Sequence, residues 1–343
     1  MIDACYIRLR DSGGRAGRVM MLLAMLLPLA GVAKVPGASV DVLRLPLSDD
    51  DLVGQAERVT TRHEDTFADL ARRHGLGYRA LRLANPGVDP WLPGAGTEVV
   101  LPQRFILPRA PRDGLVLNTA EMRLYYFPEG ATARVVTFPV SVGRGEWQTP
   151  QGSTRIRRKR RDPVWLPPES IRAEYAADGR PLAERVPAGP DNPLGRHALD
   201  LELPGYLLHG TNRPYGIGMQ VTHGCIRLYP RHIEWLYEQV AEGTPVHLVN
   251  QPYKAGWHDG MLYLEAHPPL AGDGDDGDAA AVAGMSRMVA AVIAATEAYP
   301  DYLVDWQRAR AIARDPDGRP HPIGRRTRDD RYREQYPGIG FEQ

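Results

Sequence analysis

Beyond residue 113, apolar residues gather in short runs that turn formers separate. Short runs of β-branched and aromatic residues between turns are typical of strands, so this pattern predicts strands. The clearest three are rich in β-branched and aromatic residues: 114–118, 122–127 and 134–140. The middle of the chain is therefore expected to be mainly β.

Later segments extend this pattern and add one clear helix. Short strands are expected at 206–209 and 245–249. Between them, residues 230–240 carry apolar side chains three and four positions apart, and Gly243 follows as a stop signal. We therefore predict one mainly β domain over residues 111–250, with one or two helices.

The pattern is different before residue 110. A short strand at 57–61 precedes a helix that Asp65 is expected to cap and Gly75 to close. A second helix, 78–84, ends before Pro86, because the residue before a proline is disfavoured in the helical region. A turn and a last strand complete a small α+β module, which we place at residues 56–110.

The N-terminus has the order of a secretory signal peptide. A flank with four arginines, beginning at Arg8, precedes the uncharged run Val19–Ala30, and small residues follow it. We therefore expect residues 1–33 to be removed on export to the periplasm, and residues 34–55 to form a linker or a short strand. The alternative is a retained membrane anchor, although the apolar run is short for a bilayer span.

The C-terminal residues 251–343 carry the weakest pattern. An alanine-rich helix is predicted over 279–298, and Arg287 argues against its spanning a membrane. The last thirty residues, which are polar and rich in arginine, are expected to be partly disordered. We therefore expect a partly helical C-terminal extension, a helical tail behind the β domain.

Charge excludes some classes of function. The 42 Lys and Arg residues balance the 42 Asp and Glu residues, so the chain lacks the charge of a nucleic-acid-binding protein. The basic run at 154–168 is either a solvated face or a cleft wall that attracts carboxylates. The acidic segment 271–278 lacks the glutamate that closes a calcium loop. No metal or cofactor is predicted.

One thiol carries the candidate chemistry. After loss of the leader and of Cys5, Cys225 is the one remaining cysteine, so it has no internal disulfide partner. A nucleophilic cysteine needs a nearby base or positive field to lower the pKa of its thiol. His223 lies two residues before Cys225 and Arg227 two residues after it, so an extended chain would place all three side chains on one face. Gly224 allows close approach of a substrate to the backbone.

A second histidine offers an alternative base. His209 ends an apolar run sixteen residues before Cys225, and a turn-rich loop joins the two, so strand ends could bring them together. The residues leave the choice between His209 and His223 open. A zinc site and a purely structural cluster are the competing interpretations, but the spacing lacks the paired short intervals of structural zinc.

The segment HGTNRPYGIGMQVTHGCIRL, residues 209–228, resembles the active-site motif of the L,D-transpeptidases with their YkuD-type catalytic domain. The stretches at 115–118, 121–126 and 149–152 are also similar to that domain. The module at 56–110 resembles a LysM glycan-binding module, for which a spacer without ligand is the alternative. The likeness extends from about residue 43 to 270.

The resemblance implies a YkuD-type β sandwich and a peptidoglycan L,D-transpeptidase of the Gram-negative periplasmic branch. By matching position, Cys225 would be the nucleophile and His209 the general base, oriented by the carbonyl of Gly210. His223, Gly224 and Cys225 would support the oxyanion, and Arg227 would hold the site or a substrate carboxylate.

Peptidoglycan stem peptides and glycan are the partners that this resemblance implies. The acyl acceptor stays open between another stem and the lysine of an outer-membrane lipoprotein. A carboxypeptidase or cysteine amidase that uses water is the first alternative function, because both reactions pass through the same acyl-thioenzyme. A non-catalytic wall-binding protein is the second.

Overall fold

The computed structural model describes residues 41–44, 50–130, 134–271 and 278–327 of the 343-residue chain. The expected signal peptide lies outside the described residues. Of the C-terminal residues expected to be partly disordered, 328–343 also lie outside them, but Pro320–Arg326 form a strand, so the expectation is wrong for that segment. The described residues all belong to one compact unit of the chain, which begins at Pro36.

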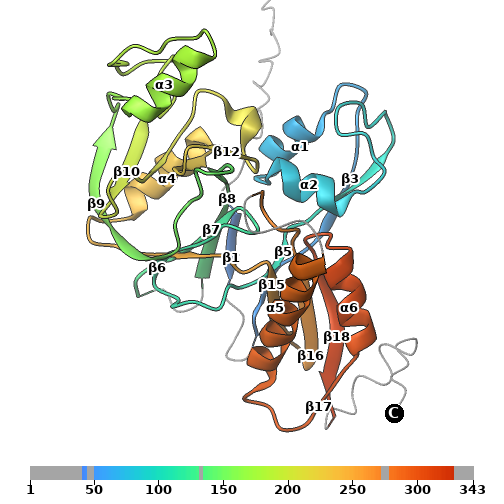
Figure 1. Ribbon diagram of the computed structural model, residues 1–343. Helices are drawn as coiled ribbons and strands as arrows, with labels where there is room; N and C mark the ends of the chain where they lie inside the picture. Colours follow the sequence, from blue (N-terminus) through green and yellow to red (C-terminus); the bar gives the residue numbers. More distant parts are fainter. Residues whose placement is uncertain (1–40, 45–49, 131–133, 272–277, 328–343) are drawn as a thin grey trace, which may run out of the picture. The chain divides into compact units, whose positions relative to one another are not determined.

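A closed ring of strands forms the centre of the fold (Figure 1). Its members are β6 (Gly114–Asn118), β7 (Arg123–Phe127), β8 (Arg134–Gly143), β9 (Gly152–Arg161), β10 (His197–Leu201), β11 (Leu207–His209), β13 (Ile226–Leu228) and β14 (Pro245–Val249). They pair in the order β8-β13-β11-β10-β9-β14-β6-β7, and β7 pairs again with β8. Strands β1 (Asp41–Arg44) and β12 (Gln220–Thr222) add to β8 from outside the ring.

Two long strands close this ring. Strand β8 pairs with β7 through residues 136–139 and with β13 through Val140 and Ser141. Strand β9 likewise pairs first with β14 and then with β10. Strands that pass from one sheet to the other join the faces of a sandwich at its corners. The mainly β fold is confirmed, and the expected sandwich is refined to a closed barrel.

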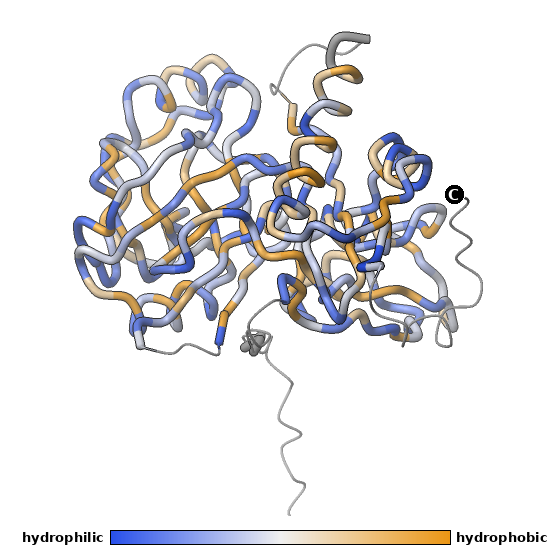
Figure 2. Tube along the Cα trace, turned by 90° about the horizontal axis from the view of Figure 1, so that it is seen from below, coloured by the Kyte–Doolittle hydropathy of each residue, from blue (hydrophilic) through white to orange (hydrophobic). Residues whose placement is uncertain are grey.

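Apolar side chains from every strand of the ring fill its interior. Phe138, Leu199, Leu208 and Ile226 are among the fully buried ones. The hydropathy-coloured trace shows hydrophobic stretches in the interior of the molecule and hydrophilic stretches along its outer edge (Figure 2). Burial of such side chains is the main favourable contribution to folding.

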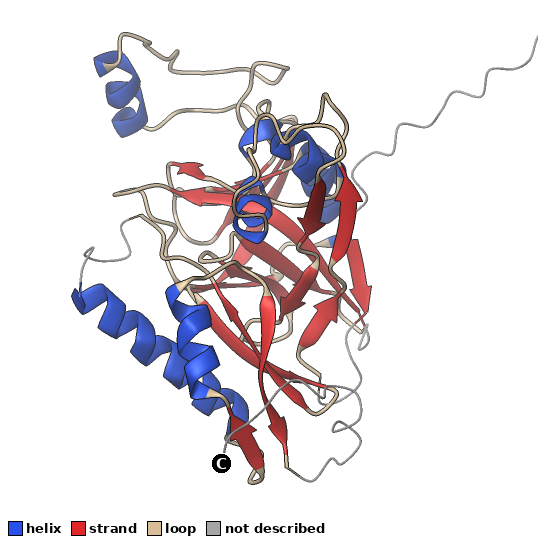
Figure 3. Cartoon of the chain, turned by 90° about the vertical axis from the view of Figure 1, so that its right-hand side faces the viewer, coloured by secondary structure: helices blue, strands red, loops and turns tan. Residues whose placement is uncertain are grey.

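Two helices accompany the barrel. Helix α4 (Pro230–Gln239) buries Ile233 and Leu236 against the barrel core, as the sequence predicts. Helix α3 (Glu169–Ala177) buries no residue and stands away from the sheet on two long loops (Figures 1 and 3).

The N-terminal module, residues 57–101, consists of a strand, two helices and a strand: β3 (Glu57–Thr60), α1 (Phe67–Arg73), α2 (Tyr78–Ala84) and β4 (Glu98–Leu101). Strands β3 and β4 pair antiparallel. The predicted cap at Asp65 is wrong by one residue. The side chain of Thr66 caps α1, while Asp65 binds Arg73 and the backbone N–H of Arg62. Next to the module, β2 (Leu52–Gly54) pairs with β5 (Arg104–Ile106).

The C-terminal region is partly helical, as expected, and its first helix matches the one predicted over 279–298, but the region also contains a sheet that was not predicted. Helices α5 (Asp278–Thr296) and α6 (Trp306–Arg314) accompany a four-stranded sheet made of β15 (Tyr253–His258), β16 (Met261–Ala266), β17 (Tyr302–Val304) and β18 (Pro320–Arg326). Asp259 and Gly260 both have positive φ and join β15 to β16 in a two-residue hairpin. An Asp-Gly pair is a strong hairpin signal, and the sequence analysis gave it no weight.

None of the helices in the described ranges has both the length and the apolar character needed to cross a membrane.

Candidate active site

Two short neighbouring strands bring the candidate residues together. Strands β11 and β13 run parallel, with Leu208 opposite Ile226 and His209 opposite Arg227. Leu208 and Ile226 point into the barrel core. Because side chains alternate between the two faces of a sheet, His209 and Arg227 lie on the opposite face. Cys225 comes directly before β13, and the expected meeting of His209 and Cys225 across strand ends stays a prediction.

The His209 ring is buried and has a defined tautomer. Its Nδ1 lies 2.6 Å from the carbonyl oxygen of Gly210. A carbonyl oxygen can only accept, so Nδ1 carries the hydrogen and the neutral ring keeps a lone pair on Nε2. Burial and the charge of Arg227 lower the pKa of His209 to about 3. At neutral pH this imidazole is therefore an uncharged potential base.

The chain turns sharply at the thiol. Strand β12 ends at Thr222, β13 begins at Ile226, and Gly224 between them has φ +96°. A Cβ on Gly224 would lie 2.8 Å from a ring carbon of Tyr206, so both the conformation and the space require glycine. The extended conformation considered from the sequence is therefore wrong for residues 223–225.

Hydroxyl groups fix this turn. The hydroxyl of Thr222 donates to the carbonyl oxygen of Cys225 at 2.6 Å, and that of Thr149 donates to the carbonyl oxygen of Gly224 at 2.8 Å. The backbone N–H of Gly143 donates in turn to the Thr149 hydroxyl at 3.0 Å. The Thr-Pro-Gln-Gly stretch noted in the sequence thus supports the backbone of the thiol loop.

The environment of the thiol differs from the sequence expectation. Burial raises the pKa of Cys225, and the carboxylate of Asp200 adds to that effect. A backbone hydrogen bond from Leu207 and the charge of Arg227 lower the pKa but do not outweigh burial. Burial therefore outweighs the positive field that the sequence analysis expected, and the sulfur is a protonated thiol at neutral pH.

His223 is held by a different set of residues. Its Nε2 lies 2.9 Å from a carboxylate oxygen of Glu174 on α3, and Arg144 also pairs with that carboxylate. The ring packs edge-on against Trp147 and lies near Tyr175. The hydrogen bond to His223 and the charge of Arg144 lower the pKa of Glu174. His223 thus ties α3 to the loop that carries the thiol.

A group of charges beside the thiol was missed by the sequence analysis. Asp200 on β10 accepts two hydrogen bonds from Arg158 and two from Arg160, both on β9. Strand register places Arg160 opposite Ala198, and Ala198 opposite His209, so these charges lie on the face that carries His209. The basic run is therefore partly neutralised by one buried carboxylate. The pairing of Asp200 with these arginines follows from the pairing of β9 with β10. It cannot be read from the sequence, because Asp200 is 40 residues from Arg160.

Arg227 itself is half-buried, and burial lowers its pKa. Its Nε is buried and has no hydrogen-bond partner within the described part of the chain. Removing a guanidinium from water without a counter-ion is costly, so such a group is well suited to meet an anion.

Groups of side chains that could hold a metal lie elsewhere among the described residues. One comprises Glu121, Glu265 and His267, all buried. The ammonium of Lys254 lies 2.7 Å from Glu121 and 2.8 Å from Glu265, so a cation is already present there. The other, Asp50 with His258 and Asp259, lies near the β15–β16 turn.

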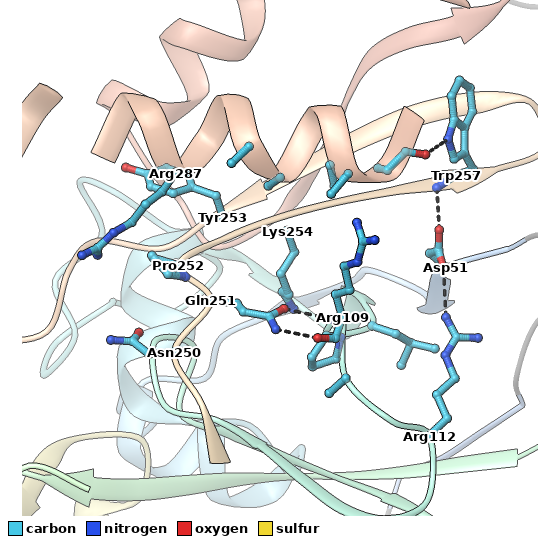
Figure 4. Close-up of a pocket in the computed structure, with 18 of the residues that line it drawn as sticks. Asp51, Arg109, Arg112, Asn250, Gln251, Pro252, Tyr253, Lys254, Trp257 and Arg287 are labelled. Carbon is cyan, nitrogen blue, oxygen red and sulfur yellow. Dashed lines mark hydrogen bonds and ion pairs between the residues drawn. The ribbon is translucent and has the colours of Figure 1, made fainter. Parts of the chain in front are cut away.

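A cavity of about 510 Å³ lies away from the thiol, against one face of α5 (Figure 4). Arginines and small side chains line it, among them Arg109, Arg112 and Arg287. The Gln251 side chain exchanges two hydrogen bonds with the backbone of Arg109. His209, Cys225 and Arg227 are not among its lining residues, so cavity size does not identify the candidate site.

Comparisons with known proteins agree with the geometry. Residues 112–248 match the family model of the L,D-transpeptidase catalytic domain, YkuD. The probable L,D-transpeptidase YcfS of Escherichia coli K12 is 42% identical over 253 residues, which cover 72% of this chain and 79% of that protein. The chain belongs to the L,D-transpeptidase family.

Other members of the family are similarly close. The probable L,D-transpeptidase YbiS of Escherichia coli K12 is 42% identical over 68% of this chain and 77% of its own. The probable L,D-transpeptidase ErfK/SrfK of Salmonella typhimurium is 42% identical over 66% of this chain and 74% of its own. All the candidate residues of this L,D-transpeptidase lie within the stretch that the family model matches.

Proposed function

We propose that the chain is a peptidoglycan L,D-transpeptidase in which Cys225 carries the acyl group and His209 moves the proton. The supporting observation is the hydrogen bond of the His209 ring to Gly210, which leaves the lone pair on Nε2, on a strand paired with the one that begins directly after Cys225. The donor is a tetrapeptide stem that ends in an L-centred diamino acid and D-alanine.

The first half of the reaction forms a thioester. His209 Nε2 takes the thiol proton as Sγ attacks the carbonyl carbon of the diamino acid, and the carbonyl electrons move to oxygen. When the tetrahedral intermediate collapses, the C–N bond to D-alanine breaks, and the imidazolium gives its proton to the leaving amine.

The second half reverses these roles. The acceptor amine attacks the thioester carbon and loses a proton to His209. The C–S bond then breaks, and the sulfur regains the proton as a thiol. Because the pKa of Cys225 is raised and that of His209 is lowered, the free enzyme holds an uncharged pair, and proton transfer accompanies attack.

Charge that develops on the carbonyl oxygen needs donors. The backbone N–H groups of Gly224 and Cys225 lie in the sharp turn at the sulfur, where a preorganised oxyanion site is expected. Arg227, whose Nε lacks a partner among the described residues, supplies the nearby positive charge and binds a substrate carboxylate. His223 supports the turn through Glu174 rather than serving as the base.

The location and the partners form part of the same proposal. The N-terminal leader directs the protein to the periplasm, the LysM-like module binds glycan, and the acceptor is a stem amine or a lipoprotein lysine. In the absence of an amine, water takes the acyl group and the same thioester is hydrolysed.

Tetrapeptide muropeptides test this proposal directly. Incubation with the protein should release D-alanine, and an added amine should appear in a new amide product. Cys225→Ala and His209→Ala should lose D-alanine release, whereas His247→Ala, a histidine on β14 bound to Asp113, should keep it. D-alanine release that survives Cys225→Ala would refute the proposal, and release without amine incorporation would reassign the enzyme to hydrolysis.

A further inference from the structure

The loop between the candidate base and the thiol touches the N-terminal module. We define the linking loop as residues 210–219, which run from His209 to the start of β12. The backbone N–H of Tyr78 donates to the carbonyl of Ile217 at 3.0 Å, and that of Arg79 to the carbonyl of Gly218 at 3.2 Å. These are the first N–H groups of helix α2, which has no side-chain cap. The linking loop therefore caps the helix with its carbonyl oxygens.

Two glycines make this contact close. A Cβ on Gly218 would lie 2.4 Å from the Cα of Gly77, and a Cβ on Gly77 would lie 3.0 Å from the Cα of Gly218. Gly218 also has φ +82°, which disfavours any other residue. Ile217 beside it is fully buried, and Met219 packs against the apolar core of the module.

The segment beyond the thiol is tied to the same module. Tyr229 follows β13 directly, is buried, and donates its hydroxyl to the carbonyl of Leu76 at 3.0 Å. On the linking loop, the ring of Tyr215 lies 5.3 Å from the guanidinium carbon of Arg72 on α1. From the barrel side, the Ser141 hydroxyl donates to the carbonyl of Gly216 at 2.7 Å. The chain on both sides of Cys225 is thus held between the module and the barrel.

We propose that the N-terminal module is a positioning element of the catalytic machinery, which holds the linking loop and thereby the placement of His209 relative to Cys225. This inference rests on the proposed function of that pair. A misplacement of reacting groups by about 1 Å can cost about 100-fold in rate, so a module remote from the chemistry can control turnover through this contact.

The substitution Gly218→Ala tests the contact, because its Cβ collides with Gly77. Two matched controls separate the collision from other effects. Gly87→Ala lies in the module at φ +84°, with no atom within 4 Å of the new Cβ, and reproduces the backbone strain. Gly216→Ala lies in the same loop with its nearest neighbour at 4.0 Å, and reproduces the added methyl group.

We expect Gly218→Ala to lower kcat for D-alanine release by about 10- to 100-fold with little change in KM, and both controls to stay within about twofold of the parent. Amide hydrogen exchange should show lost protection in residues 210–219 in Gly218→Ala alone. Lost protection together with an unchanged kcat would overturn the proposal, as would equal losses of kcat in Gly87→Ala or Gly216→Ala.

Two further measurements keep the proposal falsifiable if Gly218→Ala fails to fold. Gly77→Ala makes the milder contact from the module side, and Tyr229→Phe removes only the bond to Leu76. Each should lower kcat by a smaller factor and shift the pH dependence of Cys225 alkylation by iodoacetamide. Parent-like kcat and alkylation in both folded variants would overturn the proposal.

Alkylation of Cys225 also distinguishes failure of the proposed function from failure of the positioning role of the module. It reports on the thiol without any peptide substrate, so a parent protein that releases no D-alanine refutes the proposed function alone. If the loop variants then still alter the alkylation profile relative to their controls, the positioning role of the module stands.

Discussion

His209 lies directly opposite Arg227 in the parallel pairing of β11 with β13. Burial is the main cause that lowers the pKa of the imidazole to about 3, and the guanidinium charge lowers it in the same direction. The same guanidinium opposes the rise in the pKa of Cys225. One cation therefore keeps the base uncharged and also favours negative charge on the sulfur, which suits a site that passes a proton only during attack.

Alkylation kinetics should reveal a thiol rather than a resting thiolate. Because burial raises the pKa of Cys225, its reaction with iodoacetamide at pH 7 should be slower than that of an unperturbed cysteine, for which the pKa is about 8.5. The rate should rise with pH to an apparent pKa above that value. An apparent pKa near 6 would instead indicate a preformed thiolate–imidazolium pair.

Gly224→Ala should abolish turnover. The new Cβ would lie 2.8 Å from the Tyr206 ring at a φ of +96°, so the turn at the thiol must move. We expect kcat to fall by at least about 100-fold. Gly145→Ala, with φ +46° and open space around the new Cβ, is the matched control and should retain activity. Comparable activity in the two variants would contradict the structural requirement for glycine at 224.

The protein should lose stability as the pH falls below about 6.5. His209 and His232 are both buried, and burial is the main cause that lowers the pKa of each to about 3. In the unfolded chain, a histidine has a pKa of about 6.5. Above that pH the side chain is unprotonated in both the folded and the unfolded protein, so these histidines do not make stability depend on pH in that range. Below it the unfolded chain is protonated and the folded one is not, so each residue reduces the free energy of unfolding by about 1.4 kcal/mol per pH unit.

Urea unfolding at pH 7.5 and at pH 5.0 measures this loss. His232 packs against the rings of Phe138 and Tyr229, and neither of its nitrogens has a partner among the described residues. His232→Phe removes one titrating group without opening a cavity. It should therefore reduce the acid-induced loss by about half, and an unchanged loss would show that His232 titrates normally.

Lys254→Met should destabilise the fold by about 3–5 kcal/mol, because it leaves Glu121 and Glu265 buried without their cation. Burial would raise the pKa of Glu265, but the Lys254 charge and the His267 hydrogen bond outweigh it and lower the pKa to about 2. Equilibrium urea unfolding at pH 7.5 measures the change. A loss below about 1 kcal/mol would mean that the carboxyl groups are protonated in the parent.

Local signals predicted β6, β7, β8, β11, β14 and α4, but not β9, β10 or α3, nor the way in which the barrel closes. Residues 114–118 and the helix that starts at Pro230 were predicted from local patterns alone. Closure depends on β8 and β9, because the two halves of each strand pair with different neighbours. No local pattern in a single sequence specifies such pairing. The C-terminal sheet was missed because its Asp259-Gly260 turn was overlooked and because the buried charges of Lys254 and Glu265 obscure the apolar alternation.

The residues of the candidate site also fall into two groups: those that the sequence identifies and those that only the fold brings to the site. Cys225, His209 and Arg227 lie within nineteen residues of one another, and a long motif identifies them. Asp200 and Glu174 reach the thiol region from other elements, so only strand pairing and the placement of α3 reveal them. The raised pKa of the thiol likewise depends on burial that no local pattern reports.

Intact-protein mass spectrometry during turnover of a tetrapeptide stem tests the central claim most directly. The account predicts a covalent adduct with the mass of the stem minus D-alanine, located on the peptide that contains Cys225, lost on addition of an acceptor amine and missing in Cys225→Ala. D-alanine release without any adduct on Cys225, or an adduct of equal yield in Cys225→Ala, would contradict it.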